Sequence, residues 1–184
     1  IAWPTRATLP ARSSAEAWLC CLRFSSASLP RASSMNESTN ESTPFSLAPR
    51  LATDTLFLQR DALIELRLVD DRRWPWLMLV PCVADARELH DLSPRTGAEL
   101  FKRVRAVSAA LQEATACTSI NVAALGNVEP QLHLHVVARR PGDPNWPAPI
   151  WGFGTAQRRD DDALPAFARR VATALADLDR LDRD

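Results

Sequence analysis

Three short segments before residue 90 have the hydrophobic pattern of β-strands. Two of them alternate apolar and polar residues, and the third is a continuous apolar run closed by Pro81. The segments are TLFLQRD (55–61), ALIELRLVDD (62–71) and WPWLMLVPC (74–82). Because side chains alternate between the two faces of a strand, the first two segments predict a pair of strands with one buried face. The third predicts a buried strand.

Two later segments repeat apolar residues at the spacing of amphipathic helices. The first, 89–117, has Ser93 at a capping position and Pro94 at the first helical position, followed by apolar residues at 100, 104, 107 and 111. The second, 161–181, has apolar residues at 164, 167, 171, 175 and 178. Both segments therefore predict helices that bury one face.

Two further strands and a loop are expected between these helices. The strands are TSINVAALGN (118–127) and PQLHLHVVARR (130–140), with a turn at Gly126-Asn127. The loop PGDPNWPAPIWGFG (141–154) is rich in Pro, Trp and Gly. The order of strands and helices predicts an α+β domain: an antiparallel sheet of about five strands with one main helix and a C-terminal helix.

The composition of the chain indicates which kinds of binding partner and which cellular compartment to expect. The chain of 184 residues has 22 basic and 22 acidic residues and a net charge of +0, so it has no electrostatic footprint for nucleic acid or an anionic membrane. No apolar run approaches the ~18 residues of a membrane span. The four cysteines, at 20, 21, 82 and 117, have no CxxC spacing and are typical of a reducing compartment. We expect a cytoplasmic protein without nucleic-acid or membrane partners.

The first 34 residues differ in composition from the rest of the chain. They are rich in Ser, Ala, Arg and Pro, contain Glu16 as their single acid, and precede Met35. A transit peptide has this composition, whereas a secretory signal needs a longer apolar core than AWLCCLRF provides. The interpretation we prefer is that translation starts at Met35. We predict a disordered extension over residues 1–44 and one domain over residues 45–184.

The segment EPQLHLHVVARR (129–140) carries two of the three histidines of the chain. In a strand, Gln131, His133 and His135 lie on one face with Cα atoms about 6.5–7 Å apart, and the apolar residues between them face a core. Two histidines in register with a third polar residue favour chemistry over a purely structural strand.

Two kinds of chemistry fit this pair of histidines. Zinc can take two ligands from an HxH pair, but His90 is the remaining histidine and no cysteine or acid pair has ligand spacing. A neutral imidazole can instead attack phosphorus and form a covalent intermediate, with one ring nitrogen free and the other tied to a carbonyl. That reaction also needs donors around the phosphate oxygens. The residues alone leave both alternatives open, with zinc the less favoured.

The stretch QLHLHVV (131–137) resembles the signature of the histidine triad (HIT) family, in which three histidines alternate with apolar residues. The segments LRLVDDRRWPWLMLVP, LHDLSPRTGAELF, NVAALGNVEPQLHLH and PNWPAPIWG are similar to other parts of that family, so the resemblance covers about residues 50–155. It implies the HIT-like fold. It also implies a nucleotide phosphohydrolase or nucleotidyl transferase that forms a nucleotidyl-histidine intermediate from a dinucleoside polyphosphate or a nucleoside phosphoramidate.

The resemblance also implies roles for single residues. By position, His133 is the nucleophile, His135 binds phosphate oxygens, and Gln131 takes the place of the first histidine. Substrate or phosphate contacts are implied for Asn121, Gly126, Asn127 and Trp146. No cofactor and no metal ligand are implied in the chain, and Mg²⁺ would arrive only with a polyphosphate substrate. Because many members pair, a homodimer is expected.

The sequence departs from the family pattern at three polar positions. Gln131 replaces a histidine, Val128 stands where a Ser or Thr often donates a hydrogen bond, and Trp76 stands where many members have a histidine. These departures leave an alternative open, a non-catalytic nucleotide-binding module that retains the pocket. Arg139 and Arg140 follow the histidine strand and can favour an anionic substrate, although we expect both on a solvated face.

Overall fold

The computed structural model describes residues 44–159 and 164–181. The predictions made for residues 1–43, disorder and a start at Met35, lie outside the described residues, as do the side chains of Leu164 and Leu178. Within the described ranges, none of the helices has the length and apolar character needed to cross a membrane.

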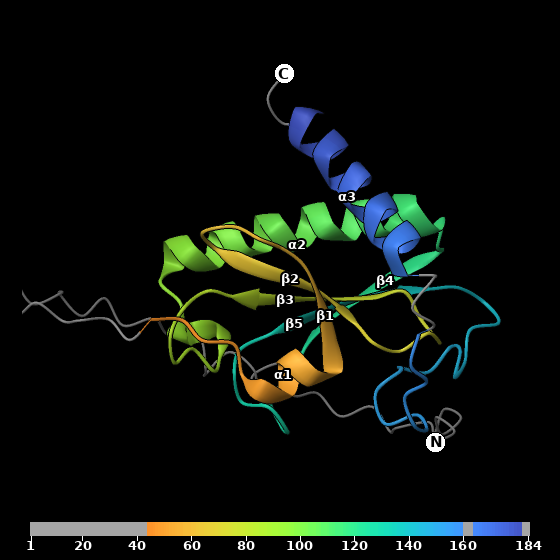
Figure 1. Cartoon of the computed structure of the whole chain (residues 1–184), viewed down its shortest axis with the longest axis horizontal. Coiled ribbons are helices and arrows are strands. Elements are labelled where there is room, and N and C mark those ends of the chain that lie inside the picture. The colour runs from red at the N-terminus through yellow and green to blue at the C-terminus, as the bar shows by residue number, and fades with distance from the viewer. Residues whose placement is uncertain (1–43, 160–163, 182–184) are drawn as a thin grey trace, which may run out of the picture. The chain divides into compact units, whose positions relative to one another are not determined.

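Five antiparallel strands form one sheet in the order β1-β2-β3-β5-β4 (Figure 1). Their bounds are β1 Thr55–Arg60, β2 Ile64–Val69, β3 Trp76–Pro81, β4 Ser119–Ala124 and β5 Leu134–Arg139. Every predicted strand is present, but β5 starts four residues later than the predicted segment 130–140. Met78 of β3 and Ala123 of β4 are the Cα partners of His135. The histidine strand therefore lies in the interior of the sheet.

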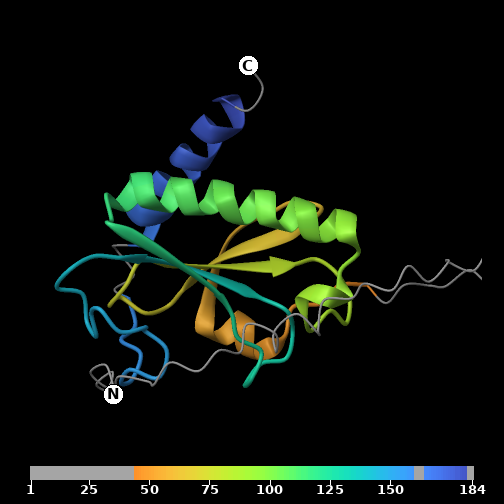
Figure 2. The same ribbon diagram turned by 180° about the vertical axis from the view of Figure 1, so that it is seen from behind.

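Two long helices cover one face of the sheet (Figures 1 and 2). They are α2, Pro94–Thr115, and α3, Leu164–Leu181. Ser93 caps α2 as predicted, because its hydroxyl accepts a hydrogen bond from the Thr96 N–H at 3.1 Å. Alternate residues of the central strands form the main core under these helices: Leu66, Leu68, Leu77, Leu79, Leu134 and Val136. The predicted α+β fold is confirmed.

The opposite face of the sheet carries the histidines and is covered by shorter elements. The helix α1, Pro49–Asp54, is not predicted by the hydrophobic pattern, and its residue Leu51 packs into a cluster with Val69, Met78 and Val80. A 3-10 helix, η2, spans Leu89–Asp91 before α2. Because both faces of the sheet are covered, β2 and β5 are buried along their whole lengths.

Candidate active site

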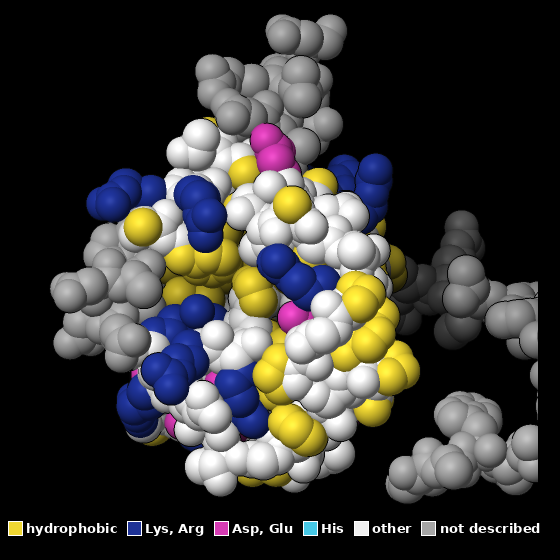
Figure 3. All heavy atoms as spheres, turned by 90° about the vertical axis from the view of Figure 1, so that its right-hand side faces the viewer, with side chains coloured by type: hydrophobic (Ala, Val, Ile, Leu, Met, Phe, Trp, Pro, Cys, Tyr) yellow, Lys and Arg dark blue, Asp and Glu magenta, His cyan; other side chains and the backbone are white. Residues whose placement is uncertain are grey.

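Two histidines lie at the start of β5. His133 directly precedes the strand, and His135 is its second residue. Their rings are perpendicular, with centroids 4.9 Å apart, so the predicted common face holds for His133 and His135. Gln131, the third residue of that prediction, lies outside β5. They are 5% and 6% exposed, and no histidine side chain is visible on the face drawn in Figure 3, where basic side chains gather beside hydrophobic ones.

The main chain holds the ring of His133 in one tautomer. Its Nδ1 lies 2.7 Å from the carbonyl oxygen of Gln131. Because a carbonyl can only accept, Nδ1 carries the proton and donates it to that oxygen. The other ring nitrogen, Nε2, therefore keeps its lone pair in the neutral imidazole.

The ring of His135 is held in the opposite tautomer by a side chain. The indole Nε1–H of Trp76 donates to Nδ1 of His135 at 3.0 Å. An indole nitrogen can only donate, so the proton of the neutral His135 ring is on Nε2. Burial, together with the charge of His133, lowers the pKa of His135 from 6.5 to about 3. In this pair of tautomers the site holds an Nε2–H donor on His135 beside a free Nε2 on the neutral ring of His133.

Tryptophan side chains surround His135. The ring centroids of Trp76 and Trp151 lie 5.2 and 5.8 Å from that of His135. The two indoles meet edge to face, with centroids 6.4 Å apart. Contact with these rings contributes to the burial of His135, and burial disfavours the charged form of the imidazole.

Both histidines line a cavity of about 560 Å³, a size typical of sites for small organic ligands. Its walls come from α1, from the ends of the first three strands, from the turn at 125–129 and from the segment 151–158. The two histidines share this cavity with Trp76, Trp151 and Asn127. The cavity therefore combines apolar and aromatic surface with a small number of polar groups.

Two ion pairs lie on the walls of the cavity. Arg50 is 3.7 Å from Asp54 within α1, and Arg158 is 2.9 Å from Asp70. The two arginine side chains are 59% and 71% exposed. Because Asp54 is exposed as well, the Arg50–Asp54 pair contributes at most about 1 kcal/mol. The Arg50 guanidinium can therefore exchange its carboxylate for an anionic ligand at small cost, and the exposed Arg158 offers a second cation on the walls of the same cavity. The sequence gives no local signal for this role, because both residues belong to ordinary surface charge patterns.

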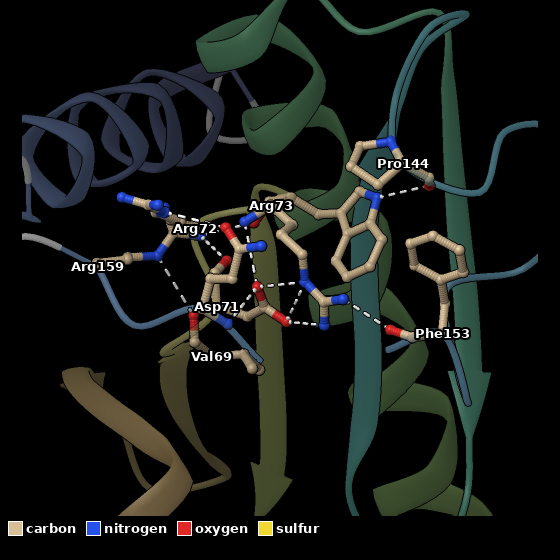
Figure 4. A network of polar contacts seen from close by, with 9 residues as sticks. Val69, Asp71, Arg72, Arg73, Pro144, Phe153 and Arg159 are labelled. Carbon is tan, nitrogen blue, oxygen red and sulfur yellow. Dashed lines mark hydrogen bonds and ion pairs between the residues drawn. The ribbon is translucent and has the colours of Figure 1, made fainter. Parts of the chain in front are cut away.

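A polar network fixes the segment 153–159 to the turn between β2 and β3 (Figure 4). Arg73 pairs with the buried carboxyl of Asp71 at 2.6 Å and donates to the carbonyl oxygen of Phe153 at 2.6 Å. Arg159 donates to the carbonyl oxygen of Asp71 at 2.8 Å. Burial opposes ionisation of Asp71, but the hydrogen bonds from Arg73 outweigh it and hold its pKa below the ordinary value. The network thereby anchors one wall of the cavity.

The residues predicted to contact substrate reach the cavity unequally. Asn127 lines it, whereas Gly126, Asn121 and Trp146 are not among the residues that do. Gly126 lies in the exposed turn next to Asn127, and Asn121 lies farther along β4. Trp151 is the tryptophan of the loop 141–154 that lines the cavity. The local pattern does not distinguish it from Trp146, because both stand beside proline or glycine.

The side chain of Gln131 bonds to a different part of the chain. Its Oε1 accepts from the Ala48 N–H, and its Nε2 donates to the Ser46 carbonyl oxygen, both at 2.8 Å. Gln131 is not among the residues that line the histidine cavity. The structure therefore does not bring its amide together with the two imidazoles, and the predicted role of Gln131 beside phosphate stays a prediction.

The prediction that Arg139 lies on a solvated face is wrong. The residue is 1% exposed, because the loop after β5 folds back over it. Its Nη1 donates to the Ala148 carbonyl oxygen at 3.1 Å, and its guanidinium lies 5.5 Å from the ring centroid of Trp146. Arg140 is exposed, as expected. Arg139 thus holds the loop in place.

Zinc binding is the other chemistry that a pair of histidines can support. In residues 44–159 and 164–181, no group of three or more His, Cys, Asp or Glu side chains is arranged to hold a metal ion. The third histidine, His90, is on η2 with its side chain 84% exposed. The described part of the chain therefore offers the pair no further zinc ligand.

The sheet, its two covering helices and the paired imidazoles define a small α+β protein with a histidine-based site. Comparison with known families agrees with this class, because the model of the HIT domain matches residues 50–142. A comparison with curated proteins gives no match.

Solved structures of histidine triad proteins are similar along most of their lengths. A HIT protein of Sinorhizobium meliloti is 45% identical, with a TM-score of 0.70, over 71% of this chain and 96% of the other. A histidine triad protein of Bradyrhizobium japonicum is 38% identical, with a TM-score of 0.71, over 72% and 99%. One from Marinobacter aquaeolei is 36% identical, with a TM-score of 0.71, over 74% and 99%. The chain therefore belongs to the HIT family.

Proposed function

We propose that the protein binds a nucleotide in the histidine cavity and acts as a hydrolase or transferase at its α-phosphorus. The observation that carries the proposal is the pair of opposite tautomers. His133 offers a free Nε2 as nucleophile, and His135 offers an Nε2–H donor for a phosphate oxygen. Membership of the HIT family and the size of the cavity support the same assignment.

The proposed reaction has two displacements at phosphorus. First, Nε2 of His133 forms a bond to the α-phosphorus, and the leaving group departs with the electron pair of its own bond to phosphorus. Water then attacks the same phosphorus, the N–P bond breaks, and the proton of the water is released to solvent. The products are a nucleoside monophosphate and the free leaving group, and His133 is regenerated as the neutral ring. An alcohol or amine in place of water gives transfer instead.

The substrates proposed are a dinucleoside polyphosphate or a nucleoside phosphoramidate. Trp76 and Trp151 offer aromatic surface to a base, and Arg50 and Arg158 offer charge to phosphate oxygens. Mg²⁺ would enter with a polyphosphate. By resemblance to the family, we also propose that the protein works in the cytoplasm as a homodimer.

The test is to trap the covalent nucleotide on His133. Purified protein is mixed with diadenosine polyphosphate or adenosine phosphoramidate, quenched within seconds and mapped by mass spectrometry. We expect an adenylyl group on the peptide that contains His133, release of AMP, and loss of both in His133→Ala. His90→Ala is the matched control, because His90 is exposed on η2, and it should behave as wild type. Equal AMP release by His133→Ala and wild type would refute the proposal.

A second candidate is a nucleotide-binding module without turnover, and Val128 favours it. This residue lines the cavity, is 68% exposed, and has no hydroxyl to donate to phosphate or to a leaving group. Losing one such donor can slow a reaction about 10²–10³-fold. Nucleotide binding measured by calorimetry, with no AMP from either wild type or His133→Ala, would select this candidate.

A further inference from the structure

The amide of Gln131 makes two hydrogen bonds to the main chain of the segment before α1. Oε1 accepts from Ala48 N–H, and Nε2 donates to the Ser46 carbonyl oxygen, each at 2.8 Å. The orientation of the amide is fixed by its partners, because a main-chain N–H can only donate and a carbonyl can only accept. The amide thus pairs with residues 46 and 48 as a peptide group of a neighbouring strand would.

The Ala48 N–H lies at the start of a helix that has no cap of its own. Ala48 is the N-cap residue of α1 and makes no side-chain capping bond. Amide groups at this end of a helix have no partner within the helix. Gln131, which is 83 residues away along the chain, supplies the acceptor. It therefore stabilises α1 at the point where the helix begins.

The helix held in this way is a wall of the histidine cavity. Arg50, Leu51 and Asp54 of α1 line the cavity, and Leu51 is also buried in the apolar cluster beneath it. The main-chain carbonyl of the same Gln131 accepts the Nδ1–H of His133. One residue therefore contacts both His133 and the segment from which the cavity wall α1 begins.

We infer that Gln131 is a positioning residue. The two hydrogen bonds from its side chain to residues 46 and 48 hold α1 in place as a wall of the substrate cavity, and its main-chain carbonyl orients His133. The expected effect on substrate binding rests on the proposed function, but the two side-chain hydrogen bonds of Gln131 do not. Because any residue at 131 keeps the carbonyl, a side-chain substitution leaves the orientation of His133 intact. It should therefore weaken substrate binding and leave the chemical step close to normal.

Two substitutions at this position separate the donor from the acceptor. Gln131→Leu removes both hydrogen bonds at similar side-chain length. Gln131→Glu keeps an acceptor for the Ala48 N–H but, when ionised, sets a carboxylate against the Ser46 carbonyl oxygen. Protonation restores a donor, so the glutamate variant should recover as the pH falls toward the usual glutamate pKa of about 4.3. Gln112→Leu is the matched control, because Gln112 is exposed on α2.

Hydrogen–deuterium exchange of the peptide that spans 46–54 tests, without any substrate, whether the side chain of Gln131 stabilises this segment. We expect exchange about tenfold faster in Gln131→Leu at pH 7, as the loss of hydrogen bonds of ordinary strength predicts. Gln131→Glu should exchange fast at pH 7 and at a rate closer to that of wild type at pH 4, when each is compared with wild type at the same pH and corrected for intrinsic exchange. Gln112→Leu should match wild type. Unchanged exchange in both position-131 variants would overturn the inference.

Steady-state kinetics then test the effect on substrate. We expect KM to rise about tenfold in Gln131→Leu with kcat within about twofold of wild type, whereas His133→Ala loses kcat. A fall in kcat with KM unchanged would overturn the positioning role. If wild type shows no turnover but the substitutions at position 131 change hydrogen–deuterium exchange as expected, the stabilising role of Gln131 is supported and the proposed enzymatic function is refuted. If Gln131→Leu does not fold, the pH response of Gln131→Glu decides the question.

Discussion

Acid should destabilise this protein through His135 in particular. The imidazole is 6% exposed and surrounded by tryptophan, and its pKa is lowered from 6.5 to about 3. In the unfolded chain the same ring has the ordinary pKa. Between these two values the unfolded state binds a proton that the folded state does not. Stability from this group is therefore complete above pH 6.5 and is lost as the pH falls from there toward 3.

The size of the effect follows from the two pKa values. Within the window between 6.5 and about 3, each pH unit costs about 1.4 kcal/mol of the free energy of unfolding. Between pH 7 and pH 5 the loss from His135 is about 2 kcal/mol. This is a large share of the ~5–15 kcal/mol that stabilises an ordinary domain.

Urea unfolding at pH 7 and pH 5 measures this loss, and a substitution isolates the part that belongs to His135. In His135→Asn the group that takes up the proton is absent, so the change between the two pH values should be about 2 kcal/mol smaller than in wild type. His90→Asn is the control, because its side chain is 84% exposed, and it should keep the wild-type change. An equal loss in wild type and His135→Asn would refute a buried neutral imidazole.

Two further changes test the polar partners of the site. Trp76→Phe keeps an aromatic ring but removes the donor that fixes the tautomer of His135. We expect AMP release to fall about 10²-fold while the circular dichroism spectrum stays unchanged. Full activity in this variant would contradict the role of Trp76. Arg73→Met leaves the carboxyl of Asp71, which is 2% exposed, without its cation. We expect the free energy of unfolding, measured with denaturant, to fall by about 3 kcal/mol. A fall of less than about 0.5 kcal/mol would show that the ion pair is not effectively buried.

Sequence periodicity predicted most of the fold because strands and amphipathic helices leave local signals. The alternation around Leu66 and the helical spacing around Val104 each follow from which side of one element is buried. The helix α1 has no such signal, because it has six residues and buries only Leu51. The late start of β5 also depends on a distant residue, because the Leu132 N–H donates to the carbonyl oxygen of Ala86, which lies after the end of β3.

The part of the site that lies on one strand could be predicted from the sequence. His133 and His135 share a face because of strand geometry, and their register with β3 then brings Trp76 to His135. The cavity walls could not be predicted, because Arg50 and Arg158 come from opposite ends of the domain. Their approach depends on tertiary packing, for which neither local sequence has a pattern.

The departures from the triad pattern are of two physically different kinds. Trp76 and Val128 line the cavity, so each affects what the site can donate to a ligand. At Gln131, the group that fixes the tautomer of His133 is the main-chain carbonyl, which every residue has. The identity of the residue at 131 therefore does not decide how the ring of His133 is oriented. Because we propose that the side chain of Gln131 holds the segment before α1, substitutions at Gln131 should alter KM, and those at Trp76 should alter kcat.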